Sequence, residues 1–266
     1  MPYRYETHLH TSQGSGCGHS TGREMVRLYK EMGYQGIIVT DHFFRGNTAV
    51  PRDLPWKERI ERFFEGYEDA KAEGERCGLD VFFGWEQRFT SDEFLVYGLD
   101  KQWLLNHPEM EAWTRKDQLK QVHLAGGCVV QPHPFRDRDY IRQILLGLQF
   151  ADAIEVANSC NMPYNDAYAL RYAREFNLFV TAGSDNHWAE DPKWQEGLLM
   201  GIEVDEPLKS IHDYVRLIRQ RGPIRPIIQP GRFDVNPSEA PDLETFWFDD
   251  EEKPVPTGRH WLMEKE

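Results

Sequence analysis

Short apolar segments alternate with longer segments of helical periodicity along most of the chain. Residues 36–40 read Gly-Ile-Ile-Val-Thr, a run without polar alternation, as expected for a strand buried on both faces. Residues 56–76 place large apolar side chains three and four positions apart, which is the spacing of one helix face. Strands that alternate with helices of this length indicate parallel β-α units.

The same criteria predict the remaining elements, and residues 80–89 and 94–99 are close enough to form a hairpin. Thr21 and Glu24 form a capping box at the start of the first helix. About seven strand–helix units in ~220 residues favour an α/β fold with a closed barrel over an open sheet. Strands are expected at residues 3–10, 36–40, 80–89, 94–99, 128–131, 153–157, 178–182 and 198–204, and helices at 21–32, 56–76, 108–125, 140–148, 164–176 and 210–220.

The composition of the chain changes after Pro230, where prolines recur and an acidic run follows. No internal repeat or low-complexity linker divides the earlier part, so we expect one barrel domain at residues 1–230. Residues 231–266 are interpreted as an extended arm, either a tail wrapped on the barrel surface or a lid or subunit contact. Three aromatic residues are expected to anchor it in places: Phe246, Trp247 and Phe248.

The composition is that of a globular protein. Of 266 residues, 40% are hydrophobic and 13% aromatic, unlike a disordered chain. The 44 acidic and 31 basic residues give a net charge of −13, which weighs against a surface that tracks a nucleic-acid polymer. A small anionic substrate remains possible, because a local cluster of metal ions outweighs a diffuse surface charge.

The chain is expected to be cytoplasmic. No apolar run approaches the ~18 residues of a membrane span, and the first residues lack the pattern of a secretory signal. The four cysteines are scattered, which is typical of free thiols in a reducing compartment: Cys17, Cys77, Cys128 and Cys160.

Histidine and acidic residues mark the ends of five expected strands. His8 and His10 lie two apart on the first strand, so both imidazoles project from the same face. Each of four later strands brings a further candidate, and mixed histidine and carboxylate ligation suits Zn, Mn or Fe. These candidates are His42 in Thr40-Asp41-His42, Glu86 in Phe83-Gly84-Trp85-Glu86, His133 between two prolines, and Asp185 and His187 in Ser184-Asp185-Asn186-His187.

Two further residues need separate interpretation. Asp41 is expected to orient an imidazole from outside the ligand set, or simply to cap the next turn. His19 lies in a glycine-rich loop after the first strand, where it is either a surface residue or a ligand delivered by folding of the loop. The joint pattern predicts a polynuclear metal site at one end of the barrel.

These motifs, which span residues 8–187 in the family's order, resemble those of the PHP (polymerase and histidinol phosphatase) family. The resemblance implies a distorted β/α barrel of about seven strands and a stand-alone metal-dependent phosphoesterase. It also implies two or three divalent ions: the first held by His8, His10, Glu86 and Asp185, the second by Glu86 and His133, and the third by His19, His42 and His187.

The sequence departs from the family pattern after the bridging glutamate. Family members usually supply another histidine there, whereas residues 91–100 contain none. Glu93 or Asp100 can substitute as a carboxylate, or the second ion is weak or absent. The number of ions is therefore left open between two and three.

The expected reaction is hydrolysis of a small-molecule phosphate ester, because a cation-bound water has a lowered pKa and the cations neutralise the phosphate. Asp185 and His187 are the candidates for assisting proton transfer. Arg45 and Arg136 follow strand ends, where they either clamp a phosphate or are ordinary loop arginines. The alternatives are an amidohydrolase-type metal-dependent hydrolase and a metal-binding scaffold without turnover; the oligomeric state is not predicted.

Overall fold

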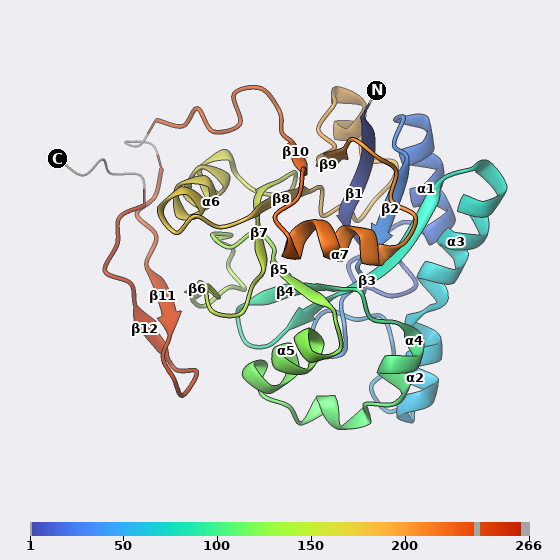
Figure 1. Cartoon of the computed structure of the whole chain (residues 1–266), viewed down its shortest axis with the longest axis horizontal. Helices are drawn as coiled ribbons and strands as arrows, with labels where there is room; N and C mark the ends of the chain where they lie inside the picture. Colours follow the sequence, from blue (N-terminus) through green and yellow to red (C-terminus); the bar gives the residue numbers. More distant parts are fainter. Residues whose placement is uncertain (1, 237–239, 262–266) are drawn as a thin grey trace.

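Each of the eight expected apolar strands forms, and together with one strand that was not expected, β10 (Arg225–Ile227), they curve into one sheet of nine (Figure 1). The computed structural model describes residues 2–236 and 240–261. The order across the sheet is β10-β9-β1-β2-β3-β4-β5-β7-β8. The strands are β1 (Tyr3–Leu9), β2 (Gly36–Val39), β3 (Asp80–Arg88), β4 (Glu93–Tyr97), β5 (Cys128–Gln131), β7 (Ala153–Asn158), β8 (Val180–Gly183), β9 (Gly201–Val204) and β10 (Arg225–Ile227).

Seven of these nine strands run in the same direction, and β4 and β9 run opposite to them. The expected hairpin is the antiparallel pair β3–β4. Just after β8, Asn186 bridges to Leu9 of β1, and its carbonyl accepts the His10 N–H at 2.8 Å. This contact nearly closes the sheet, so the predicted distorted β/α barrel is confirmed. Of the two reversed strands, β4 belongs to the expected hairpin, and the reversal of β9 was not indicated by the sequence pattern.

Helices and short helical turns surround the sheet. α1 begins after Thr21, which forms the expected capping box with Glu24. The apolar faces of the helices pack on the strands; for example, Tyr214 and Ile218 are buried against Tyr97 and Cys128. The helical elements are α1 (Gly22–Glu31), α2 (Trp56–Phe63), α3 (Glu65–Cys77), α4 (Lys101–Leu105), η1 (Pro108–Glu111), α5 (Arg115–Leu124), α6 (Pro163–Glu175), η2 (Pro192–Glu196) and α7 (Ile211–Arg219).

Two expected helices are divided. The helix expected at residues 56–76 breaks at Phe64, where the chain turns and α3 packs against α1. The helix expected at residues 108–125 becomes η1 and α5, because the Thr114 hydroxyl caps a new helix by accepting the Asp117 N–H at 3.1 Å. Helical periodicity continued through both breaks, so it could not reveal them.

The prediction of a helix at residues 140–148 is wrong. Here β6 (Ile144–Leu145) pairs in parallel with β11 (Thr245–Phe248). The Gln131 side chain donates to the Leu145 carbonyl at 2.7 Å and accepts the Gly147 N–H at 2.8 Å. These long-range bonds take the backbone groups that a helix would use.

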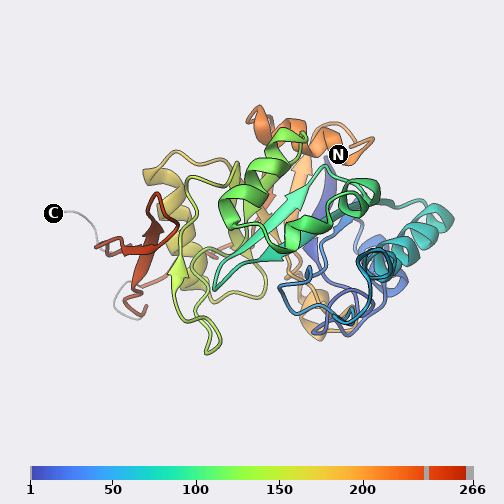
Figure 2. The same ribbon diagram turned by 90° about the horizontal axis from the view of Figure 1, so that it is seen from below.

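The C-terminal segment lies at one side of the molecule, next to α6 and away from α1 and α3 (Figures 1 and 2). β11 and β12 (Pro254–Pro256) form a hairpin that extends β6 into a three-stranded sheet. Trp261 is buried among aromatic rings, and its Nε1–H donates to the Thr245 hydroxyl at 2.9 Å. Residues 237–239 and 262–266 of the expected arm lie outside the described residues.

Two other expectations meet the structure directly. All four cysteines are free thiols, as their spacing predicted. No helix in the described part of the chain combines the length and apolar character needed to cross a membrane.

Candidate metal centre

The strand ends with histidine and acidic candidates meet at one end of the barrel, because these strands run in the same direction. His8 lies on β1 and His10 follows directly after it, and both are fully buried. Their Nε2 atoms lie 3.2 Å apart. Asp185 Oδ1 lies 3.4 Å from His8 Nε2 and 3.1 Å from His10 Nε2.

Glu86 from β3 stands at the centre of the cluster. Its Oε1 atom is 3.2 Å from His133 Nε2 and 3.6 Å from His8 Nε2. Its Oε2 atom is 2.8 Å from His42 Nδ1 and 3.4 Å from His10 Nε2. One carboxylate therefore touches imidazoles from three other strand ends, which is the arrangement of a bridging ligand.

Four sets of three side chains each bring potential ligand atoms within 4.8 Å of one another. Nearly every residue named by the resemblance is among them, and so is Glu93, which opens the reversed strand β4 at the same rim. The sets are His8, His10 and Asp185; His8, Glu86 and His133; His42, Glu86 and Glu93; and His10, His42 and His187. Asp100 does not join them; it caps α4 by accepting the Trp103 N–H.

The donor set fits divalent cations. His42 Nδ1 and Glu86 Oε2 are buried and 2.8 Å apart, yet neither has a hydrogen-bond partner. Buried polar atoms without partners are costly, and a shared cation is the compensation that imidazole and carboxylate suit best. The chemistry of the site therefore agrees with the predicted metal centre.

Two of these side chains are presented by an unusual backbone. His133 has φ 30° and Asp185 has φ 52°, both in the left-handed region that residues with a side chain seldom adopt. Such conformations cost of order 1–3 kcal/mol and gather at functional sites. Here they turn each side chain from its strand end toward the cluster.

Groups outside the cluster fix the orientation of its imidazoles. Glu155 of β7 accepts from His8 Nδ1 at 3.1 Å, which leaves His8 Nε2 directed at the cluster. His10 Nδ1 is 3.1 Å from the Ser15 hydroxyl, which donates to Asp41 at 2.7 Å. Asp41 thus reaches an imidazole through a serine. The sequence analysis missed Glu155, although a carboxylate inside an apolar strand is the signal that singled out Glu86.

Charges within the cluster oppose the effect of burial. Burial raises the pKa of Asp185, but the Arg136 guanidinium, whose Nη1 is 2.7 Å from Asp185 Oδ2, holds it well below its usual range. Burial also raises the pKa of Glu86, and the charges of His42 and His8 bring it well below its ordinary value. Both carboxylates are therefore ionised and attract cations.

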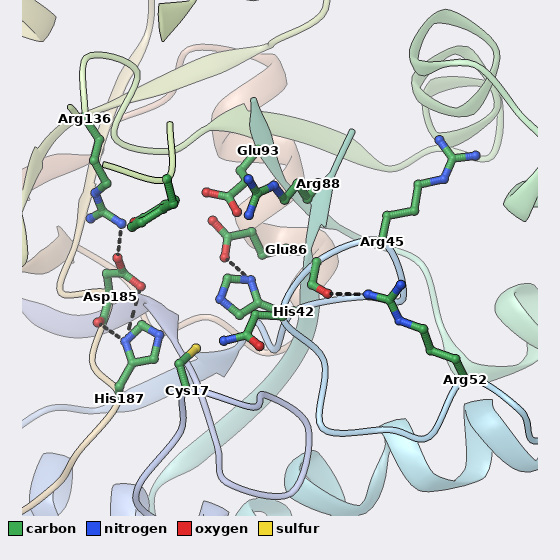
Figure 3. Close-up of a pocket in the computed structure, with 13 residues that line it drawn as sticks. Cys17, His42, Arg45, Arg52, Glu86, Arg88, Glu93, Arg136, Asp185 and His187 are labelled. Carbon is green, nitrogen blue, oxygen red and sulfur yellow. Dashed lines mark hydrogen bonds and ion pairs between the residues drawn. The ribbon is translucent and has the colours of Figure 1, made fainter. Parts of the chain in front are cut away.

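His19 and Cys17 both lie outside every such set that the described residues form. The His19 side chain is exposed beside Trp188, with ring centroids 6.3 Å apart. Cys17, two residues earlier in the same loop, lies against His42 and His187 instead (Figure 3). Burial raises the pKa of the Cys17 thiol, and its hydrogen bonds to His187 and His42 outweigh burial and bring the pKa to about 7.

The cluster forms one wall of a cavity of about 490 Å³ (Figure 3). Arg45 and Arg136 both line it, as do Arg52 and Arg88, which the sequence analysis did not single out. Arg136 is buried and bonded to Asn158 and Asn161 as well as to Asp185, whereas Arg45 donates to the Trp113 carbonyl at 2.8 Å.

No family model matches this sequence, and no curated protein does. Solved structures do match. A two-domain protein from Bacteroides vulgatus, which contains a predicted PHP-like metal-dependent phosphoesterase, is 16% identical with a TM-score of 0.56; the match covers 82% of this chain and 64% of that one. PsfC from Pseudomonas syringae is 18% identical with a TM-score of 0.56, over 88% of this chain and 94% of PsfC.

An amidohydrolase from Chromobacterium violaceum, solved with bound sulfate, is 16% identical over 81% of this chain and 96% of its own, with a TM-score of 0.51. At these identities the matches establish the fold. They confirm at that level the resemblance seen in the histidine motifs: the chain has the distorted β/α barrel of the PHP family.

Proposed function

We propose that this chain is a metal-dependent phosphoesterase that hydrolyses a small-molecule phosphate ester at a di- or trinuclear centre. The observation that carries the proposal is the overlap of the four ligand sets: His8, His10, His42 and Glu86 each belong to two of them. Overlapping sets favour cations near enough to act on one substrate together.

The ligand assignment follows the expected one where the contacts support it. His8, His10, Glu86 and Asp185 would hold one ion; Glu86 and His133, with Glu93 in place of the usual histidine, would hold a second. Zn, Mn or Fe suits these donors. When bound, the cations supply the Lewis acidity that activates water and neutralises a phosphate ester.

Asp185 and His187 differ in their fitness to move a proton. Asp185 Oδ2 accepts from Arg136, and Oδ1 faces the two imidazoles of β1, so we assign Asp185 to ligation. His187 donates from Nδ1 to the Asp185 carbonyl at 2.7 Å, which leaves Nε2 to accept a proton in a dinuclear centre or to bind the third ion in a trinuclear one. Its side chain is 24% exposed in the cavity, where a substrate oxygen can reach it.

The substrate class is inferred from the arginine wall, defined as Arg45, Arg52 and Arg88. None of these three has a carboxylate partner among the described residues, although the chain carries a net charge of −13. Unpaired guanidinium groups beside a cation site favour an anionic substrate, and a phosphate suits their fork of donors. The small cavity and acidic surface disfavour a nucleic-acid polymer, and the free thiols favour the cytoplasm.

The activity test starts from protein stripped of metal by a chelator and reloaded with Zn²⁺, Mn²⁺ or Fe²⁺. A panel of phosphomonoesters and phosphodiesters is then assayed for release of phosphate or alcohol. We expect turnover that needs the added metal. Glu86→Gln is expected to lower it by at least about 10²-fold, since it removes the bridging charge. Glu75→Gln, on the exposed face of α3, is the control that keeps full activity.

Two outcomes contradict the proposal. Cleavage of amides with no turnover of any ester supports the amidohydrolase alternative, which shares this fold. Binding of metal, measured by elemental analysis, without turnover of either class supports a scaffold.

A further inference from the structure

The thiol of Cys17 faces the group formed by His10, His42 and His187. Its side chain forms hydrogen bonds with His42 and His187 and lines the same cavity. The three imidazoles already bring one nitrogen each within 4.8 Å of one another. The sulfur atom thus contacts two of these three imidazoles, although Cys17 belongs to none of the four sets.

The loop that carries Cys17 is held in place by backbone bonds. Gly16 N–H donates to the Asn47 carbonyl at 2.7 Å, and Gly18 N–H donates to the Ser15 carbonyl at 3.0 Å. A Cβ atom on Gly18 would lie 2.4 Å from the Thr11 carbonyl oxygen, so only glycine permits this close approach. The tight turn directs Cys17 into the cavity and leaves His19 outside.

His19 has a different contact. Its N–H donates to the His187 carbonyl at 2.7 Å, so its backbone steadies the ligand loop while its exposed ring lies beside Trp188. The thiol of this loop, and not its histidine, therefore lines the cavity.

We propose that Cys17, and not His19, completes the third metal position as a thiolate ligand with His42 and His187. Binding replaces the thiol proton with a sulfur–metal bond, and the proton passes to solvent. A thiolate favours Zn²⁺ or Fe²⁺ over Mn²⁺ at this position. The inference rests on the proposed metal centre, but it does not depend on which substrate is hydrolysed.

The test is titration of the metal-free full chain with Co²⁺, because a cobalt–thiolate bond gives a charge-transfer band in the near ultraviolet. We expect the band in the wild-type protein and in His19→Ala, and its loss in Cys17→Ser. Cys160→Ser is the matched control, because Cys160 is also half-buried, with its Sγ 3.3 Å from the Asp185 carbonyl oxygen.

A second variant keeps the test informative if Cys17→Ser folds poorly. Cys17→His is expected to lack the band yet to bind as much zinc, by elemental analysis, as the wild type. A band that survives in Cys17→Ser, or disappears in His19→Ala, overturns the assignment, as does Co²⁺ binding by the wild type without a band or no Co²⁺ binding at all. If the protein shows the band but turns over no phosphate ester, the assignment of Cys17 as a thiolate ligand stands and the proposed function is contradicted.

Discussion

Arg136 offsets the electrostatic cost of gathering carboxylates at the barrel rim. Its side chain is only 9% exposed, and its Nη1 atom lies 2.7 Å from Asp185 Oδ2. Two asparagine oxygens accept its remaining donors, those of Asn161 at 2.9 Å and Asn158 at 3.0 Å. This guanidinium therefore acts as a fixed positive charge behind the ligands, and the arginines that line the cavity without a carboxylate partner among the described residues are those of the arginine wall.

Replacing this charge has a consequence that depends on metal. Arg136→Met leaves Asp185 ionised and buried, so we expect the free energy of unfolding of the metal-free protein to fall by about 3–5 kcal/mol. Added zinc is expected to restore part of the loss, because the cation neutralises the same carboxylate. Urea unfolding with chelator and with zinc measures both effects. Arg142→Met, at an exposed position, is the control. An equal loss with and without zinc would contradict the argument.

At this scale, the candidate ligands on strands and just past strand ends could be predicted, and the residue that the loop after β1 turns into the cavity could not. His8 and His10 follow from strand alternation, and Glu86 follows from the cost of a carboxylate in an apolar strand. The choice between Cys17 and His19 depends on hydrogen bonds from the loop to distant backbone, such as that from Gly16 to Asn47. Nothing local in the sequence encodes those partners.

At the scale of elements, the close packing of α1 against α3 supports the hydrogen bonds that orient the candidate metal ligands. A Cβ atom on Gly22 would lie 2.2 Å from the Gly66 carbonyl oxygen. A Cβ atom on Gly66 would lie 2.1 Å from Thr11 Oγ1 and 3.1 Å from Asp41 Oδ2. Because both positions are glycines, the helices approach closely and α3 lies against Asp41. Asp41 accepts from the Ser15 hydroxyl, which in turn contacts His10.

Gly66→Ala tests this contact. The added methyl group must displace α3 or Thr11, and overpacking of this kind costs about 1–3 kcal/mol of unfolding free energy. Thr11 donates to Asp41 from its N–H at 2.6 Å and from its hydroxyl at 2.7 Å. We also expect weaker zinc binding, measured by competition with a chromophoric chelator, because a displaced Thr11 loses these bonds. Glu75→Ala on the exposed face of α3 is the control. Full zinc affinity in a destabilised Gly66→Ala protein would show that the helix crossing is structural only.

Elements were predictable where the signal is local. The capping box of Thr21 and Glu24, and the apolar run of β2, depend only on neighbouring residues. The prediction of a helix at residues 140–148 failed because the backbone hydrogen bonds of this segment are made with Gln131 and with β11, which lie far away along the chain. Contacts at long sequence separation override local helical periodicity there.

At the scale of the whole molecule, the C-terminal segment contacts residues behind the candidate metal centre and not the site cavity itself. None of its described residues lines the site cavity. Arg232 instead donates to Asp166 Oδ2 at 2.7 Å and to the carbonyls of Asn158 and Asn161. Because the side chains of those two asparagines accept from Arg136, a chain of hydrogen bonds joins this segment to the residues behind Asp185. The assignment of residues 231–266 as a separate unit stays a prediction.

Removal of Arg232 is expected to have a pH-dependent effect. Burial raises the pKa of Asp166 from its ordinary 3.8 to about 6, and the charge of Arg232 keeps it from rising further. The folded chain therefore holds this proton more tightly than the unfolded chain, and stability falls as the pH rises from about 4 to 6. In Arg232→Met the pKa rises higher still, so the fall continues to higher pH.

The difference between the variant and the wild type should thus be largest near pH 8, about 3–5 kcal/mol of unfolding free energy, and should shrink as the pH approaches 4. Urea unfolding across this range measures it, with Lys253→Met as the control for an exposed ion pair of the same segment. Zinc affinity should fall together with stability, because the asparagines that hold Arg136 lose their support. A difference that stays constant with pH would mean that Asp166 does not change its charge over this range in the folded protein, and that the proposed pKa effect of Arg232 is absent.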